Sequence, residues 1–179
     1  MNELSQHLTP STLVLGVGND ISGDDAFGPM LARKLEPVLG KFAIDAGLAP
    51  ENWTGPITKL APQKILIADA VAFGGNAGEM RIIDPENLAN GLPATHGPGL
   101  GAFIEIILTR LPNCEIKILA VQPAQTGIMK PMSEEVARAV DVISAEIERA
   151  GARAEGRGEG SPCASETRST ERDGSRVGA

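Results

Sequence analysis

The order of apolar and polar positions predicts a chain in which strands and helices alternate. Residues 12–18 form an apolar run that ends in glycines, which is typical of a buried strand. In residues 27–38, apolar side chains recur every three or four positions, which predicts a helix with one apolar face. Gly40 follows as a suitable helix stop. The first part of the chain therefore predicts a strand followed directly by a helix.

The same alternation continues to about residue 150. Apolar segments predict further strands, residues 93–99 predict a loop rich in Gly and Pro, and periodic segments predict further helices. The predicted strands are 41–45, 64–70, 79–84 and 115–121, and the predicted helices are a short one around Thr58, one over 100–111, and one opened by Ser133 with Val136, Val140, Ile143 and Ile147 on one face. Such alternation is typical of an α/β three-layer sandwich with a twisted, mostly parallel sheet and helices on both faces.

The ends of the chain differ in composition from its centre. Residues 1–11 are mostly polar, and we expect a flexible N-terminus there. Residues 151–179 are rich in Gly, Ser, Arg and Glu and nearly free of large apolar side chains. A segment of this kind buries too little surface to offset its ordering entropy, so we expect a disordered low-complexity tail. Residues 12–150 are predicted to form one folded domain.

Composition and charge narrow the classes of function. The chain has 179 residues and a net charge of −7, which argues against a nucleic-acid partner because phosphate backbones attract basic surfaces. Cys114 and Cys163 lie far apart and form no Cys-x-x-Cys pair, which argues against a zinc or disulfide framework. Neither a signal peptide nor a membrane-spanning run is recognisable, so we expect a cytoplasmic protein with no membrane partner.

Three side chains are candidates for chemistry, and each also has a purely structural interpretation. Asp25 follows the glycines of the first strand, and its spacing from Ser22 also fits a helix-capping box. A dinucleotide fingerprint does not fit there, because Ile21 occupies a position that needs Gly. Asp69 ends an apolar strand, where an acid is costly unless it has a partner or caps a turn. His96 lies in the predicted Gly/Pro loop and is alternatively an ordinary surface residue.

Together the three candidates indicate a metal site. In a parallel sheet, the first and third strands can bring Asp25 and Asp69 to the same carboxyl edge, where ligands gather. Two carboxylates and one imidazole from His96 suit a borderline divalent metal such as nickel or zinc. Other catalytic patterns do not appear in the sequence: it has no Gly-x-Ser-x-Gly elbow, no Cys in a setting beside a His, and no Asp-Thr-Gly or Asp-Ser-Gly turn.

The motifs, in this order along the chain, resemble the hydrogenase maturation protease family. They are Leu-Gly-Val-Gly-Asn at 15–19, Gly-Asp-Asp-Ala-Phe-Gly-Pro at 23–29, Asp-Ala-Gly-Leu-Ala-Pro-Glu at 45–51, Ile-Ala-Asp-Ala at 67–70, Thr-His at 95–96, Val-Gln-Pro at 121–123 and Pro-Met-Ser at 131–133. The similarity runs from about residue 12 to residue 150. It is closest to the proteases that serve the formate-hydrogenlyase type of hydrogenase, hydrogenase 3.

The resemblance implies a phosphorylase/hydrolase-like fold and an endopeptidase classed with the aspartic-type peptidases. It implies that Asp25, rather than Asp24, joins Asp69 and His96 in contacting nickel, and that the same trio serves the cut. The nickel is carried by the precursor of the [NiFe] hydrogenase large subunit, whose C-terminal extension the protease removes. Either the bound metal or one of the two acids can activate the attacking water.

The resemblance also links the segment at Asp45 and Gly47 to substrate recognition. Family members often have Asp-Gly-Gly or Asp-Gly-Thr there, whereas this chain has Asp-Ala-Gly. Two other functions are compatible with parts of the pattern. One is a non-catalytic nickel-binding escort protein of hydrogenase assembly. The other is a peptidyl-tRNA-hydrolase-like enzyme, which needs a basic groove that this acidic chain argues against.

Overall fold

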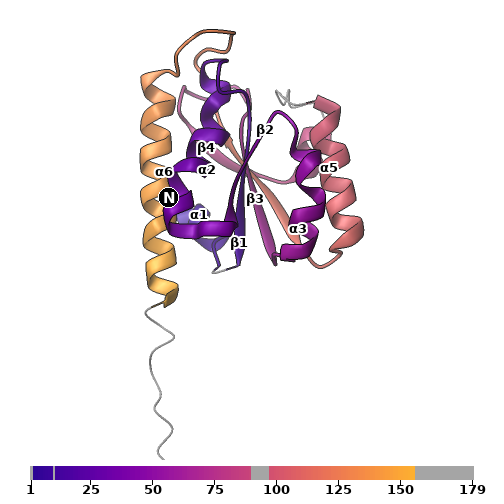
Figure 1. The fold of residues 1–179 in the computed structure, drawn as a ribbon. Coiled ribbons are helices and arrows are strands. Elements are labelled where there is room, and N and C mark those ends of the chain that lie inside the picture. Colours follow the sequence, from indigo (N-terminus) through magenta and orange to yellow (C-terminus); the bar gives the residue numbers. More distant parts are fainter. Residues whose placement is uncertain (1, 10, 90–96, 156–179) are drawn as a thin grey trace, which may run out of the picture.

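The computed structural model of the protein describes residues 2–9, 11–89 and 97–155 (Figure 1). Its centre is a five-stranded sheet within these residues, with strand order β2-β1-β3-β5-β4. Four strands are parallel, and β4 pairs antiparallel with β5 at one edge. The strands are β1 (Thr12–Val17), β2 (Ala43–Gly47), β3 (Lys64–Ala70), β4 (Met80–Ile83) and β5 (Glu115–Val121). The predicted mostly parallel sheet is confirmed.

Helices cover both faces of the sheet (Figure 1). Helices α1, α2 and α6 lie on one face, and α3 and α5 lie on the other. The helices are α1 (Asn2–Gln6), α2 (Phe27–Leu39), α3 (Thr54–Leu60), α4 (Pro85–Ala89), α5 (Gly97–Arg110) and α6 (Glu134–Glu155), with 3₁₀ turns η1 (Asp24–Ala26), η2 (Gly40–Phe42) and η3 (Pro50–Trp53). This is the predicted α/β three-layer sandwich.

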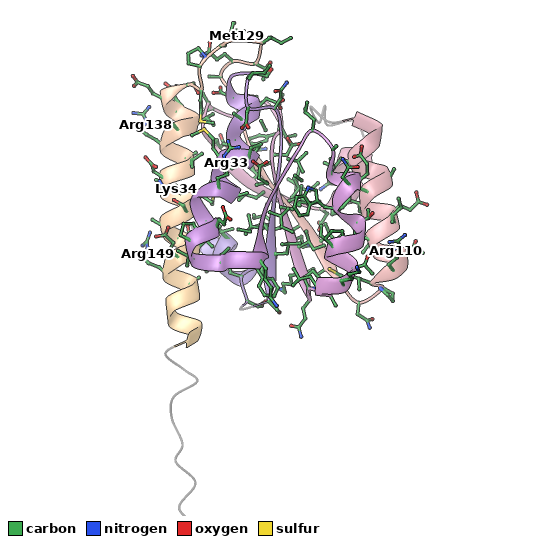
Figure 2. All side chains as sticks on the ribbon, in the orientation of Figure 1. Arg33, Lys34, Arg110, Met129, Arg138 and Arg149 are labelled. Carbon is green, nitrogen blue, oxygen red and sulfur yellow. The ribbon has the colours of Figure 1, made fainter. Side chains whose placement is uncertain are left out.

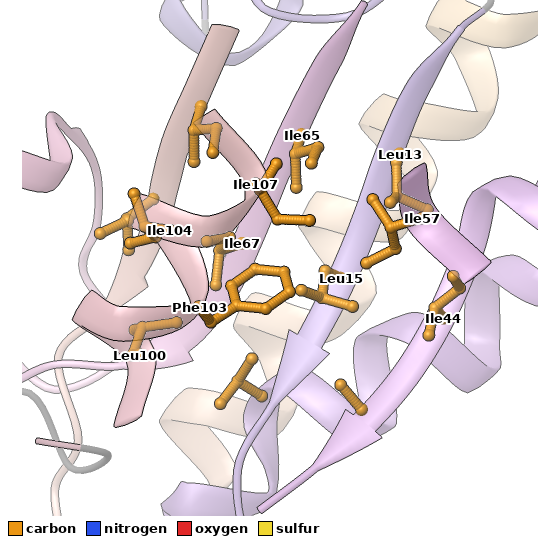
Figure 3. Packing of buried hydrophobic residues seen from close by; sticks show 14 of the residues in the cluster. Leu13, Leu15, Ile44, Ile57, Ile65, Ile67, Leu100, Phe103, Ile104 and Ile107 are labelled. Carbon is orange, nitrogen blue, oxygen red and sulfur yellow. The ribbon is translucent and has the colours of Figure 1, made fainter. Parts of the chain in front are cut away.

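Two apolar cores hold the layers together, one on each face of the sheet. Alternate residues of a strand point to opposite faces, so Leu13 and Leu15 of β1 enter one core while Val14 enters the other. Figure 3 shows the first core, where Phe103 and Ile107 of α5 pack on the sheet. Strands covered on both faces are apolar at nearly every position, which is why β1 and β3 read as continuous apolar runs in the sequence.

Most elements agree with the sequence pattern, and the largest differences in their boundaries are at β2 and α5. β3 and β5 match the predicted ranges, whereas β2 starts two residues late because Gly40–Phe42 forms a 3₁₀ turn. Helix α5 starts at Gly97, so the loop prediction is wrong for 97–99, while 93–96 lie outside the described residues. Pro98 is compatible with a helical first turn because the N–H that proline lacks has no intrahelical partner there. Val38, the last position of the predicted apolar helix face, is 53% exposed, and Leu39 packs against the core instead.

The two chain ends differ from each other in the structure. Within the segment predicted to be flexible, residues 2–6 form α1, because Leu4 is fully buried in the core that α2 and α6 share. At the other end, α6 continues to Glu155, so residues 151–155, predicted to belong to the disordered tail, are helical. The remainder of the predicted disordered tail, residues 156–179, lies outside the described residues.

Helix α6 is amphipathic rather than apolar all round. Its predicted face of Val136, Val140, Ile143 and Ile147 is buried, as expected, and its other positions carry many charges. Within the described ranges, no helix is both long enough and apolar enough to cross a bilayer.

Candidate functional site

Gly16 of β1 and Gly28 of α2 lie where the backbones of these two elements approach each other closely. A Cβ atom on Gly16 would lie 2.1 Å from the carbonyl oxygen of Gly28. A Cβ atom on Gly28 would lie 2.3 Å from the carbonyl oxygens of Ala68 and Val17. The first turn of α2 therefore rests directly on the backbones of β1 and β3. This close approach brings the acids of η1 to the carboxyl edge of the sheet.

The backbone of Asp25 is fixed by the same connection. Asn19 N–H donates to the carbonyl oxygen of Asp25 at 3.1 Å, and Asp25 N–H donates to the carbonyl oxygen of Ser22 at 3.3 Å. Gly18 is at φ 152°, and a Cβ atom there would lie 1.9 Å from the Asp25 carbonyl oxygen. Neither η1 nor α2 has a side-chain cap, so the capping box does not account for this acid. Asp25 is only 7% exposed.

Asp24, the neighbouring acid, is fully buried and anchors a distant loop. Its Oδ2 accepts hydrogen bonds from the backbone N–H groups of Ala124 at 2.7 Å and Gln125 at 2.9 Å. Its Oδ1 accepts a hydrogen bond from Ser133 N–H at 2.6 Å. These three bonds tie the loop between β5 and α6 to the connection between β1 and α2. Asp24 therefore has a structural role, which leaves Asp25 as the candidate for chemistry.

Asp69 lies at the same edge of the sheet as Asp25. It is the penultimate residue of β3, it is fully buried, and it is in register with Ala120 of β5. Strands β1 and β3 are parallel neighbours, and η1 contacts β3. The structure thus places the two predicted acids at one carboxyl edge.

The third predicted member of the site, His96, lies outside the described residues. Among the residues that are described, no group of three or more His, Cys, Asp or Glu side chains is arranged to hold a metal ion. The described part of the site is therefore the pair of carboxylates.

Asp45 and Gly47 lie near this edge, at the end of β2. The Asp45 carboxylate accepts a hydrogen bond from Gly47 N–H at 3.1 Å, and Gly47 has φ 55°, a conformation that suits glycine. Arg33 of α2 donates to Asp45 Oδ2 at 2.6 Å and to Asp20 Oδ1 at 2.6 Å. The Arg33 hydrogen bond lowers the pKa of Asp20, while burial opposes this shift. Arg33 thus joins β2 to the connection between β1 and α2.

A groove of about 480 Å³ runs beside β2. Trp53 and Leu60 line it together with Arg33 and Asp45, and Trp53 also packs against the core. Trp53 is only partly buried by this packing, so part of it faces the groove.

Sequence reasoning missed the residues that hold the surrounding loops. The Gln122 carboxamide oxygen accepts hydrogen bonds from the N–H groups of Phe73 and Gly74 at 2.9 Å and of Gly75 at 3.2 Å. Gln122 therefore fixes the segment that follows β3. The only signal in the sequence was the Val-Gln-Pro motif itself, because its partners lie more than 45 positions away.

Comparisons with known proteins agree with this architecture. The sequence model of the hydrogenase maturation protease family matches residues 29–150. The chain is 37% identical over 139 residues to the hydrogenase 3 maturation protease of Escherichia coli K12, covering 76% of this chain and 88% of that protein. It is 31% identical over 134 residues to a putative hydrogenase maturation protease of Methanocaldococcus jannaschii, covering 69% of this chain and 78% of that protein.

Solved structures show the same fold. The crystal structure of the [NiFe] hydrogenase maturation protease HycI from Thermococcus kodakarensis superposes with a TM-score of 0.75 at 27% identity, covering 84% of this chain and 99% of that one. The solution structure of the endopeptidase HycI from Escherichia coli gives a TM-score of 0.68 at 35% identity, covering 77% and 89%. The five-stranded sheet and its helices are therefore shared with these proteins.

Proposed function

The chain belongs to the hydrogenase maturation protease family, and from this premise we propose that it removes the C-terminal extension from the nickel-loaded precursor of a [NiFe] hydrogenase large subunit in the cytoplasm. Protease activity on a hydrogenase subunit follows from membership of the family. The specific substrate form, the role of nickel and the compartment are the proposal. The observation that carries it is the pair of largely buried acids, Asp25 and Asp69, at one edge of the sheet.

In this proposal, Asp25, Asp69 and His96 contact nickel that arrives as part of the substrate. Carboxylates and imidazole are suitable ligands for this borderline metal when they are deprotonated. A largely buried position strengthens electrostatic interactions relative to the exposed surface. A precursor without nickel offers nothing for the trio to bind, so its peptide bond is not held in position for the cut.

The acids can also serve the chemistry of peptide hydrolysis. The attacking water must lose a proton, and a carboxylate within hydrogen-bonding reach can accept it. We assign this role to Asp25 or Asp69, because Asp24 holds the loop between β5 and α6 through three backbone N–H groups. Asp45 and Gly47, at the end of the neighbouring strand, are proposed to contact the substrate and to contribute to its selection.

An intact-mass assay tests this function. The purified protein is mixed with the large-subunit precursor from the same organism, once loaded with nickel and once without it. A single shortened product from the loaded form alone is the expected result. Cleavage of both forms would remove nickel as the recognition element, and tight binding without cleavage would instead identify a non-catalytic escort. His96→Ala and Asp69→Asn should abolish the product while the proteins remain folded.

A further inference from the structure

Three large apolar side chains project into solvent at the connection between β1 and α2 and at the loop bonded to it, and we call Ile21, Ile128 and Met129 the apolar lip. Their exposed fractions are 55%, 73% and 82%. The three are contiguous, because Met129 N–H donates to the Ile21 carbonyl oxygen at 2.6 Å and Ile128 precedes Met129 in the chain. Figure 2 shows Met129 at the outer end of the molecule, above the start of α2. Exposed side chains of this kind, when grouped, mark interaction surfaces.

Hydrogen bonds of neighbouring residues hold the two segments that carry the apolar lip in place. Gly23 N–H donates to the Lys130 carbonyl oxygen at 3.1 Å, and Asp24 N–H donates to the Gln125 carbonyl oxygen at 3.0 Å. The carboxylate of Asp24 accepts three further bonds from the same loop. Met129 has φ 63°, a conformation that is unfavourable for a residue with a side chain and must be imposed by its surroundings. The exposure is therefore a feature of an anchored loop.

The position of the apolar lip indicates what covers it. Ile21 lies four residues before Asp25 on the same connection, and the loop that carries Ile128 and Met129 is bonded to Gly23 and Asp24, so the lip adjoins the connection that carries Asp25. A folded precursor that delivers its C-terminal segment to nearly buried acids must place its body against the rim around them. Three side chains are too few for a stable dimer of this chain, since a stable interface buries about 800 Å² on each partner. They suit one part of a larger contact that the precursor makes at this edge.

We propose that the apolar lip docks the large-subunit precursor, through an apolar patch on the precursor beside its C-terminal segment. This inference rests on the proposed function, because it takes the substrate from it. The lip contributes to binding and orienting the precursor. The acids contact the nickel and act on the peptide bond only after the precursor has docked. Because such a contact acts before the chemical step, its loss should raise KM and leave kcat unchanged.

Charged substitutions in the apolar lip test the proposal. The double variant Ile128→Asp/Met129→Asp removes the two most exposed members, and Asp is better tolerated than Met at a positive φ. With the nickel-loaded precursor, we expect at least about a tenfold rise in KM and an unchanged kcat. The matched control is Val142→Asp on α6, which replaces an apolar residue that is 49% exposed at a distance from the lip. Its kinetics should equal those of the wild type.

The lip variants test the docking role whether or not the protein cuts the precursor. Unchanged kcat/KM in a folded lip variant would overturn the docking role while leaving the protease function standing. If the wild type binds the precursor without cutting it, dissociation constants replace kinetics. In that case a tenfold weaker complex for the lip variant alone supports docking although the proposed function has failed. Equal dissociation constants, or no complex with the wild type, would overturn the docking role.

Discussion

Asp24 and Asp25 are adjacent in the sequence, yet their carboxylates have different surroundings. Asp24 is enclosed by three backbone N–H donors from residues about 100 positions away. An amide in its place would turn an N–H₂ group toward one of these donors. Asp24→Asn should therefore lower the free energy of unfolding by about 2 kcal/mol or more, because a buried charge-assisted hydrogen bond is lost and a donor is left unsatisfied.

Asp25→Asn should have the opposite profile, with processing abolished and a smaller loss of stability than Asp24→Asn, because the backbone hydrogen bonds that fix Asp25 in the connection survive the change. Urea unfolding and the intact-mass assay on both variants make the comparison. A destabilised Asp25→Asn that still cuts the precursor would exchange the roles assigned to the two acids. This contrast also bears on His96→Ala and Asp69→Asn, because loss of the cut assigns a residue to the site only where the variant stays folded.

Cys114 is predicted to be chemically inert. Burial, with a smaller contribution from the negative charge of Glu115, raises the pKa of the Cys114 thiol to about 11. At pH 7.5 roughly one thiol in three thousand is then the reactive thiolate. Iodoacetamide should leave Cys114 unmodified in the folded protein and alkylate it in denaturant, as peptide mass mapping can show. Cys114→Ala should retain processing, and loss of the cut in a folded variant would reopen a thiol mechanism.

At the scale of elements, the contact between α2 and the sheet depends on the missing side chain of Gly28. Gly28→Ala forces a Cβ atom against two backbone oxygens of β1 and β3, which cannot move without disturbing the strands. We expect a loss of about 3 kcal/mol or more in the free energy of unfolding.

Gly101→Ala is the matched control for this substitution. Gly101 lies inside α5, and a Cβ atom there has open space around it. Alanine should stabilise that helix by about 0.5–1 kcal/mol, because glycine loses more backbone entropy on folding. Urea unfolding of both variants measures the difference. A Gly28→Ala protein as stable as the Gly101→Ala protein would show that α2 can shift away from the sheet at low cost.

The sequence predicted the elements best where burial is complete. Most of β3 and the second half of β5 are buried on both faces, and the predicted ranges of both strands agree with the structure. Prediction was weaker where local signals compete: Gly97 and Pro98 have loop composition but begin α5. Helix α1 depends on tertiary packing that includes the full burial of Leu4, which no local pattern reports.

At the scale of the whole molecule, topology explains why part of the site was predictable. Alternation implied a parallel sheet, and a parallel sheet gathers the ends of its strands at one edge, so Asp25 and Asp69 could be placed together in advance. The residues that hold the loops at that edge, Asp24 and Gln122, could not be identified from the sequence. Asp24 and Gln122 act through partners distant in sequence, and their types alone do not reveal which N–H groups they will meet.

The two termini should differ in their importance to the whole molecule. Residues 156–179 contain Val177 as their only branched aliphatic residue, and their acidic and basic residues are equal in number, so removing them leaves the net charge unchanged. Among the α6 side chains whose burial the structure describes, the last buried apolar one is Ile147, well before this segment. A chain that ends at Glu155 should therefore keep its melting temperature within about 2 °C and its kcat/KM within about twofold.

By contrast, Leu4→Ala at the other terminus should lower the free energy of unfolding by about 2–3 kcal/mol, because Leu4 is fully buried between α1 and the core. Thermal melts and precursor cleavage, measured on both variants beside the wild type, test the pair. A tenfold loss of kcat/KM on removing residues 156–179, with an unchanged melting temperature, would mean that this segment contacts the precursor. The docking surface would then extend beyond the apolar lip.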